Sequence, residues 1–358
     1  MRRLKVAILM GGPSSEHEVS LMTGRNVLEN LDKGKYKPIP IFITKEGTWI
    51  RGKEELKPRE ALYDIDIVFN ALHGEYGEDG TVQAVLDYLK IPYTGSGVFA
   101  SRLGMNKALS RSIFKEYGLP VPRYILLNKE DWICGSDSLP DFIKDKVGIP
   151  CVVKPNNLGS SVGISIVDRK ENINFALSLA FEKANEAIIE EYIKGIEITC
   201  GVLENGKSNY KEKSDSSSLK FLEALPVTQI IPPDGRFFDY EVKYNGTTQE
   251  ITPALIDERI YKQAQEMAKI AHYALKCKGY SRTDMIIKLL DVGSEELDVG
   301  GETISVQASN IKFPTSNIYI LEINTLPGLT KESLLPKAAQ TAGLNFSQLL
   351  DRIIQSAI

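Results

Sequence analysis

The sequence predicts an α/β fold with two or three compact domains. Its 358 residues are too many for one comfortable hydrophobic core. The first ninety-odd residues alternate strand patterns with helix patterns and glycine turns, which is typical of a parallel sheet covered on both faces. The middle of the chain instead sets short apolar runs on either side of a glycine-rich loop, which favours antiparallel strands.

The individual elements follow from apolar periodicity and turn residues. The expected strands are the apolar runs 6–10, 39–43, 65–70, 151–154, 162–167, 187–191, 197–203 and 318–324, with one more just after Asp284. The expected helices are 18–31, 81–89, 106–117, 173–184, 258–278 and 346–354. In the helix at 258–278, spacings of four and three alternate between the apolar positions Ile260, Ala264, Met267, Ala271 and Ala274.

The composition excludes several functional classes. Lys and Arg number 43 and Asp and Glu 47, and the net charge of −4 gives no electrostatic reason to bind nucleic acid. The apolar run at 6–10 is too short for an export signal, and no stretch approaches a membrane span. Cys151 and Cys200 fall inside apolar runs without a metal-binding spacing, so we expect buried free thiols. The protein should be soluble and cytoplasmic, with no nucleic-acid or membrane partner.

Two segments of the N-terminal sheet are expected to border a ligand site. Ligands of parallel sheets bind beyond the carboxyl ends of the strands, where segments 11–20 and 73–80 begin. Ser15 and Glu18 also fit a capping box at a helix start, so Glu18 has either that structural role or a role in binding an amino-acid ammonium group. His73 also has two interpretations: it is either a structural loop histidine whose ring nitrogens are hydrogen-bonded, or a functional residue.

Two further motifs indicate a nucleotide–metal site. Lys154 precedes a glycine- and serine-rich loop at 156–163, in which backbone N–H groups can approach phosphate oxygens; a plain flexible hairpin is the alternative. Glu322 and Asn324 lie two apart on a strand and therefore on one face, which suits Mg²⁺. Arg282 and Asp284 repeat this spacing. A solvated strand edge is the alternative for each pair, and the turn at 190–197 that leads to a new strand is a weak purine-binding signal alone.

Together these motifs resemble those of the D-alanine–D-alanine ligases of the ATP-grasp superfamily. The matching stretches run in the family's order from Gly11 to Pro336: GGPSSEHEVSL, ALHGEYGEDGTVQ, NKALSR, VVKPNNLGSSVGIS, EEYIKGIE, FFDYEVKY, GYSRTDMI, and LEINTLPGLT with SLLP. The resemblance implies a three-domain ATP-grasp architecture in which two α+β domains clamp ATP. The implied domains are 1–103 with the first D-alanine site, 104–190 with the phosphate loop, and 191–358 with the metal ligands, lid and second D-alanine site.

The resemblance also assigns residues to ligands. The ATP-binding set would be Lys107, Lys154, Gly159, Ser160, Ser161, Gly163, Glu190, Glu191, Ile193, Glu197, Phe237 and Lys243. The ligands of two Mg²⁺ or Mn²⁺ ions would be Asp284, Glu322 and Asn324. The substrate-binding set would be Glu18, His73, Ser333 and Leu334, and the catalytic set Glu18, Ser160, Tyr244, Arg282 and Gly328. The implied reaction joins two D-alanine molecules through a D-alanyl phosphate, releasing ADP and phosphate, for peptidoglycan synthesis. The resemblance further implies a homodimer, and a lid at 237–248 that excludes water.

The chain departs from the family pattern in three places. Leu158 stands in the phosphate loop where some members have a polar residue, and Lys331 and Glu332 replace small or neutral residues. The largest departure is the polar insert Leu289–Asn317, because Glu322 lies 38 positions after Asp284 where the family needs a short hairpin. We expect this insert to extend the hairpin at the surface.

Three other functions are alternatives to the ligase that the resemblance implies. A sister ligase could add D-lactate or D-serine, although the lid sequence at 238–244 resembles the dipeptide-forming version. A nicotinamide dehydrogenase needs a G-x-G-x-x-G fingerprint, which Gly11-Gly12-Pro13 does not supply. A non-catalytic nucleotide-binding module would be expected to lack Arg282, Asp284 or Glu322, and all three are present.

Overall fold

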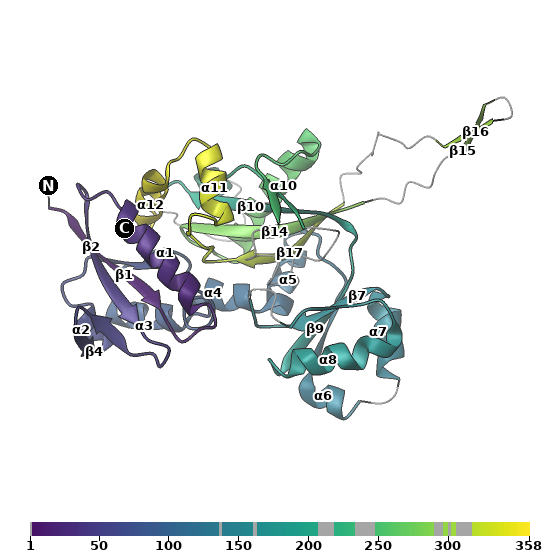
Figure 1. The fold of residues 1–358 in the computed structure, drawn as a ribbon, viewed down its shortest axis with the longest axis horizontal. Helices are drawn as coiled ribbons and strands as arrows, with labels where there is room; N and C mark the ends of the chain where they lie inside the picture. The colour runs from purple at the N-terminus through teal and green to yellow at the C-terminus, as the bar shows by residue number, and fades with distance from the viewer. Residues whose placement is uncertain are drawn as a thin grey trace.

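The structure is a computed structural model in which three sheets and their covering helices make up most of the molecule (Figure 1). It describes residues 2–135, 138–159, 163–206, 218–232, 248–289, 296–299, 302–305 and 317–358. Helices α4 (Val98–Met105) and α5 (Lys107–Glu116) run between the first sheet and the other two (Figure 1). The end of α4 and the start of α5 meet at Asn106, whose side chain accepts a hydrogen bond from the Leu109 N–H and caps α5.

The first sheet has the strand order β4-β3-β2-β1-β5 and contains the predicted parallel strands. Its strands are β1 (Leu4–Gly11), β2 (Tyr36–Ile43), β3 (Trp49–Arg51), β4 (Glu54–Leu56) and β5 (Ile67–Asn70). Its helices are α1 (His17–Asn30), α2 (Pro58–Ala61) and α3 (Thr81–Leu89). Strand β1 is parallel to β2 and β5, as predicted, whereas β3 and β4 form an antiparallel edge hairpin that the sequence analysis missed.

Alternating residues of β1 enter two different cores, because successive side chains of a strand point to opposite faces. Val6 and Ile8 pack in the core that includes Val27 of α1 and Leu350 of α12 (Phe346–Gln355). The other face of β1 packs in a core with α3. Helices therefore cover both faces of this sheet, as predicted. The last helix of the chain, α12, packs on the same face as α1.

The second sheet is antiparallel, in the order β6-β9-β7-β8. Its strands are β6 (Tyr124–Asn128), β7 (Cys151–Pro155), β8 (Ser165–Val167) and β9 (Glu186–Glu191). Its helices are α6 (Lys129–Ile133), α7 (Leu139–Val147), the short 3₁₀ helix η1 (Lys170–Asn172) and α8 (Ile173–Phe181). The strands predicted at 151–154 and 187–191 and the helix predicted at 173–184 are confirmed, whereas the strand predicted at 162–167 is β8 in its second half only, and β6, α6 and α7 were not predicted.

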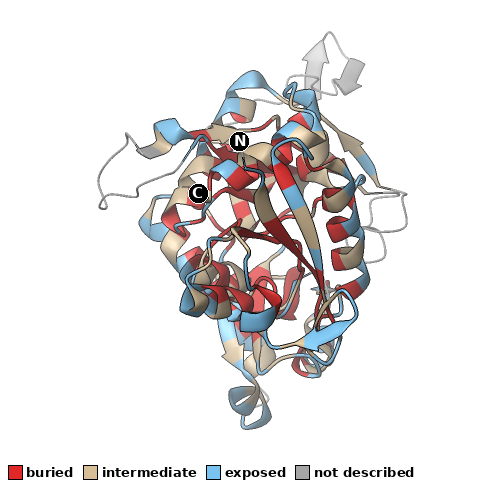
Figure 2. Cartoon of the chain, turned by 90° about the vertical axis from the view of Figure 1, so that its left-hand side faces the viewer, coloured by how far each residue is buried: buried red, intermediate tan, exposed pale blue. Residues whose placement is uncertain are grey.

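The third sheet has six strands in the order β13-β12-β10-β14-β17, with β11 paired to β10. Its strands are β10 (Gly195–Glu204), β11 (Leu222–Ala224), β12 (Thr228–Ile231), β13 (Gln249–Ile251), β14 (Tyr280–Lys288) and β17 (Ile318–Asn324). Its helices are the 3₁₀ helix η2 (Ser218–Phe221), α10 (Glu258–Ala274), α11 (Leu334–Thr341) and α12. The five apolar positions predicted for the face of α10 are all buried, and so are most residues of β10 and β14. Seen from the side of the first sheet, the molecule has buried strands at its centre and exposed segments at its edges (Figure 2).

Most of the predicted insert lies outside the described residues. Within it, β15 (Glu296–Val299) and β16 (Glu302–Ser305) pair as an antiparallel hairpin. Among the cysteines, Cys151 and Cys200 are buried and free, as predicted, and burial raises the pKa of the Cys151 thiol to about 11. None of the described helices combines the length and the apolarity that crossing a membrane requires.

Candidate active site

The centre of the candidate site is a pair of neighbouring antiparallel strands, β14 and β17. Their register sets Asp284 directly opposite Glu322 and Arg282 directly opposite Asn324. Because opposite residues share a face and residues two apart share a face, all four side chains project from one side of the sheet. The expectation that Arg282 and Asp284 precede a strand was wrong: both lie inside β14, and the ladder is irregular just after Asp284.

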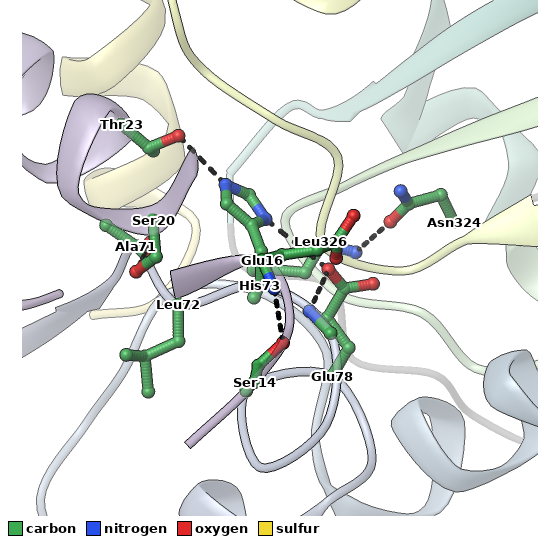
Figure 3. Close-up of polar contacts among 12 residues, drawn as sticks. Ser14, Glu16, Ser20, Thr23, Ala71, Leu72, His73, Glu78, Asn324 and Leu326 are labelled. Atoms are coloured by element: carbon green, nitrogen blue, oxygen red, sulfur yellow. Dashed lines mark hydrogen bonds and ion pairs between the residues drawn. The ribbon is translucent and has the colours of Figure 1, made fainter. Parts of the chain in front are cut away.

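Asp284 is held by two neighbours. Its carboxylate accepts hydrogen bonds from Nε and Nη2 of Arg282, at 2.9 and 2.8 Å, and from the Thr199 hydroxyl on β10 at 2.6 Å. The Oδ1 atom of Asn324 accepts from the Leu326 N–H at 2.8 Å, which fixes the amide with its oxygen toward the chain turn (Figure 3). Two carboxylates and an amide on one face form an all-oxygen donor set of the kind that Mg²⁺ prefers.

Clusters made of His, Cys, Asp and Glu side chains are the usual alternative for a metal site. Within the described ranges, no three such side chains gather closely enough to hold a metal ion. A metal at this face would therefore depend on the amide of Asn324 and on ligand oxygens in addition to Asp284 and Glu322. That composition matches sites in which Mg²⁺ binds one or two carboxylates together with phosphate oxygens of a substrate.

A cluster of buried charges lies next to these strands, between α5 and the second sheet. Lys107 Nζ is 3.7 Å from Glu322 Oε2, and Lys154 Nζ is 2.9 Å from Glu190 Oε1. Arg111, one turn after Lys107 on α5, forms an ion pair with Glu190 Oε2. Three cations therefore face two carboxylates, so that the cluster has an excess of positive charge suited to an anionic ligand.

Burial and pairing set the ionisation of this cluster. Burial lowers the pKa of Lys107, and the neighbouring Glu322 carboxylate only partly offsets this effect. For Glu190, burial alone would raise the pKa, but the Arg111 and Lys154 charges outweigh burial and hold that pKa below its ordinary value. The carboxylate of Glu190 is therefore ionised at neutral pH, although only 4% of the residue is exposed.

The stem of the glycine-rich loop is fixed to the start of α5. Asn156, fully buried, accepts from the Lys107 N–H through its carbonyl and from the Ala108 N–H through its side chain. The Lys107 ammonium donates to the Leu158 carbonyl at 2.5 Å. With Leu109 capped by Asn106, these contacts occupy the first N–H groups of α5, so positive charge for a phosphate comes from lysine side chains rather than from the helix end.

The predicted purine-binding turn joins β9 to β10. Glu191 is bound to Arg123, through the Arg123 N–H at 2.8 Å and Nε at 2.9 Å. Ile193 is buried, and Glu197 lies on β10 opposite Ile286 of β14. The Glu191 side chain is therefore occupied by Arg123, and within the turn the Tyr192 N–H donates to the Pro150 carbonyl while the Lys194 carbonyl accepts from the Leu289 N–H.

A second cluster surrounds His73, where the segment after β5 meets α1. The His73 ring lies 2.8 Å from the Thr23 hydroxyl and 3.4 Å from Glu78 Oε1, and Glu78 also accepts from the Gly74 N–H (Figure 3). His73 is 4% exposed, so it is a largely buried histidine with a partner on each ring nitrogen. The carboxyl end of the parallel sheet therefore brings segments 11–20 and 73–80 together, as predicted.

The carboxylate that reaches this cluster is Glu16, not Glu18. A methyl group built on Gly74, which has φ +68°, would lie 3.0 Å from the Glu16 carboxylate, and Figure 3 shows Glu16 beside His73. Glu18 is exposed in the first turn of α1. The alternative of a capping box at Ser15 and Glu18 is also wrong, because α1 begins at His17 with Glu16 at its N-cap and without a side-chain cap.

The segment after β17 lies against the same cluster. A methyl group built on Gly328 would lie 2.9 Å from the Ser333 hydroxyl and 4.0 Å from the His73 ring, so Gly328, Ser333 and His73 are close neighbours. The Ser333 hydroxyl accepts from the Thr330 N–H at 3.0 Å, and Leu334 begins α11. Five other predicted residues lie outside the described residues: Ser160, Ser161, Phe237, Lys243 and Tyr244.

Sequence reasoning missed several residues that hold the site together. Arg111, Thr199, Thr23 and Glu78 each contact a predicted site residue across 5 to 85 positions of the chain. Most of these contacts are long-range, and only Arg111 had a local signal: it lies four residues after Lys107 and therefore on the same face of its helix.

The comparisons with known proteins agree over nearly the whole chain. The family model "D-ala D-ala ligase N-terminus" matches residues 5–61 and 53–96. The model "D-ala D-ala ligase C-terminus" matches 113–292 and 311–355, and the interruption falls inside the predicted insert. Proteins named D-alanine–D-alanine ligase from Syntrophobacter fumaroxidans and Clostridium beijerinckii are each 39% identical, over 99% of this chain and 98% and 99% of their own lengths.

Solved structures give the same result. The D-alanine–D-alanine ligase from Bacillus anthracis complexed with ATP has a TM-score of 0.73 at 35% identity, over 100% of this chain and 97% of that one. The VanG D-Ala:D-Ser ligase from Enterococcus faecalis has a TM-score of 0.78 at 30% identity, over 100% of both chains. The predicted ATP-grasp fold class is confirmed by these likenesses.

Proposed function

The chain belongs to the D-alanine–D-alanine ligase family, enzymes that use ATP to join two D-alanine molecules for peptidoglycan synthesis, and we propose how its residues divide that work. The observation that carries the assignment is the register of β14 and β17, which sets Asp284 opposite Glu322 within reach of Lys107. Nucleotide phosphates bound at this point would meet both the oxygen ligands of a metal and the ammonium groups of Lys107 and Lys154.

In the first step, one carboxylate oxygen of the first D-alanine attacks the γ-phosphorus of ATP. A phosphorus–oxygen bond forms to that carboxylate, the bond to the β-phosphate oxygen breaks, and ADP leaves from D-alanyl phosphate. Two anions must approach each other, so Lys107 and Lys154 offset the charge of the phosphates. Two Mg²⁺ or Mn²⁺ ions bound by Asp284, Glu322 and Asn324 would supply Lewis-acid neutralisation of the same charge.

The remaining contacts to the nucleotide would come from the turn between β9 and β10 and from the glycine-rich loop. Glu190, Glu191 and Ile193 would hold adenine largely through backbone groups, and Glu197 would accept from the ribose hydroxyls. The loop with Gly159, Ser160, Ser161 and Gly163 would close over the phosphates. Phe237 and Lys243 are assigned to the nucleotide by family resemblance alone.

The first D-alanine is proposed to bind beside His73. Its ammonium group needs an anionic partner, and the position of Glu16 next to Gly74 and His73 supports Glu16 for this role in place of Glu18. By family resemblance, Ser160 and Tyr244 would orient that glutamate.

In the second step, the neutral amine of the second D-alanine attacks the acyl carbon. The tetrahedral oxyanion would accept hydrogen bonds from Arg282 and the Gly328 N–H. As this intermediate collapses to the peptide bond, the carbon–oxygen bond to phosphate breaks and the amine's extra proton leaves with the phosphate. Ser333 and Leu334 would contact the second D-alanine. The closeness of Gly328 and Ser333 to His73 supports two adjacent amino-acid subsites.

The division into 1–103, 104–190 and 191–358, the homodimer and the cytoplasmic location belong to the same proposal. Each range contains one of the three sheets, apart from β9, which ends one residue past the second boundary. Light scattering of the purified chain tests the homodimer.

The direct test of substrate choice is phosphate release with ATP and Mg²⁺, with identification of the product. We expect D-alanyl-D-alanine from D-alanine alone and no turnover with L-alanine. The structural likeness to a D-Ala:D-Ser ligase makes D-serine the second candidate for the attacking amine. In competition between D-alanine and D-serine, a product mixture dominated by the D-serine dipeptide would contradict the assignment.

A further inference from the structure

Glu190 is shared by two cations that reach it from different elements. Lys154 on β7 contacts one carboxylate oxygen, and Arg111 on α5 forms an ion pair with the other. The exposed fraction of the side chain is 0% for Arg111, 7% for Lys154 and 5% for Glu190, so water cannot replace either partner. The proposed function, however, requires Lys154 to bind a phosphate of ATP.

The guanidinium of Arg111 is fixed by contacts on three sides. Its Nε and Nη2 donate to the Leu321 carbonyl on β17, at 3.3 and 3.0 Å, while its Nη1 faces Glu190. Its central carbon lies 5.5 Å from the centre of the Tyr124 ring, and Tyr124 is the cross-strand partner of Glu190. An arginine keeps its charge at any pH that leaves the protein folded, and its fork can satisfy both acceptors at once.

The Lys154 and Arg111 side chains therefore differ in how easily each can move away from Glu190. Lys154 has a compact ammonium group at the end of a flexible chain, and among the described residues its ion-pair partner is the Glu190 carboxylate. If Lys154 moved to a phosphate and Glu190 had no other partner, Glu190 would be a buried carboxylate without a counter-ion, which is strongly unfavourable. With Arg111 in place, Glu190 stays paired.

We propose that Arg111 is a positioning residue that keeps Glu190 neutralised while Lys154 exchanges that carboxylate for a phosphate of ATP. This inference rests on the proposed role of Lys154 at the phosphates. It predicts that Arg111 acts on ATP affinity through the charge of Glu190. Since Leu321 precedes Glu322, the same guanidinium also joins the nucleotide side of the site to the strand of the metal ligands.

The test measures binding of a non-hydrolysable ATP analogue with Mg²⁺ by calorimetry, in the full chain, beside the melting temperature of each variant. R111M should weaken analogue binding by about a hundredfold, because Lys154 then stays with Glu190. R111K keeps the charge and should stay within about tenfold of the parent, although it loses the fork to Leu321.

The double variant R111M/E190Q gives the decisive comparison. A neutral amide needs no counter-ion, so this variant should recover most of the affinity that R111M loses, even if it melts at a lower temperature. If the role of Arg111 were purely structural, the double variant would bind the analogue as weakly as R111M or more weakly. R111K would then also lose as much affinity as R111M. Either result would overturn the inference.

The variant K154M separates this inference from the proposed function. If K154M and the parent bind the analogue with equal affinity, Lys154 does not contact the phosphates. The proposed exchange of Glu190 for a phosphate is then wrong as well. If K154M binds weakly but R111M binds normally, the phosphate role stands and the role of Arg111 is wrong.

Discussion

The hydroxyl of Thr199 donates a 2.6 Å hydrogen bond to Oδ1 of Asp284, its direct partner on the neighbouring strand. With the guanidinium of Arg282, this bond fixes the direction in which the carboxylate faces. Groups that orient a metal ligand are often nearly as important as the ligand, because they limit the geometries available to it.

Replacement of Thr199 by valine is therefore expected to raise the Mg²⁺ concentration needed for half-maximal turnover by about tenfold, since it removes the hydroxyl and keeps the shape. Thr283 supplies a matched control on the adjacent strand: it is fully buried, and its hydroxyl has no hydrogen-bond partner among the residues that the structure describes. Thr283→Val should leave the Mg²⁺ titration unchanged. Equal titrations for the two valine variants would argue against an orienting role for Thr199.

The change Glu322→Gln tests the metal site itself. It removes one negative charge while retaining the size of the side chain, so we expect kcat to fall by at least about a hundredfold with little change in melting temperature. The control is Glu55→Gln, at an exposed position on β4 of the first sheet, which should be indistinguishable from the parent. Near-normal phosphate release by Glu322→Gln at saturating Mg²⁺ would remove Glu322 from the ligand set.

The long, regular elements could be predicted from the sequence, and the short ones could not. Strand β17 was predicted with its actual bounds, because an apolar run at 318–321 leads into the alternating residues Glu322, Ile323 and Asn324. Strands β3 and β4 have three residues each, too few for a period to appear. Arg282 and Asp284 were placed before their strand because polar residues facing a site look like a strand boundary.

Residue pairing at the site shows a different limit. Motif spacing identified Asp284 and Glu322 but not their register, which depends on strand pairing across the insert. Glu16 and Glu18 are both acidic and two apart, so the choice between them depends on where α1 begins, and predicted helix ends are uncertain by that distance. Glu190 was predicted as a site residue, but its pairing with Arg111 spans 79 positions and had no signal in the sequence.

The choice between the two glutamates is testable with a matched pair of variants. Glu16→Gln should raise the KM for the first D-alanine about tenfold or more, because a charged hydrogen bond to its ammonium group is lost, and leave the KM for ATP unchanged. Glu18→Gln, on the exposed side of the same helix turn, should change neither value by more than about twofold. The reverse result would restore Glu18 to the substrate site.

The last prediction concerns how the C-terminal helix is held to the first sheet. Asp351 on α12 accepts a 2.6 Å hydrogen bond from the Tyr36 hydroxyl on β2 and lies 2.9 Å from Lys35 Nζ. Burial alone would raise the pKa of Asp351, but Tyr36 and Lys35 outweigh burial, and the pKa lies below its ordinary value. A carboxyl group whose pKa is lowered by folding stabilises the fold above its unfolded pKa, near 3.9, and loses that contribution as the pH falls through its folded pKa.

Asp351→Asn should therefore lower the free energy of unfolding by about 1 kcal/mol at pH 7, and the difference from the parent should shrink as the pH falls below about 4. Urea unfolding of both proteins at a series of pH values measures this difference. Asp145→Asn, at an exposed position on α7, is the control and should match the parent at every pH. A difference between Asp351→Asn and the parent that stays constant from pH 7 to pH 3 would mean that packing at α12, rather than the charge of Asp351, is responsible.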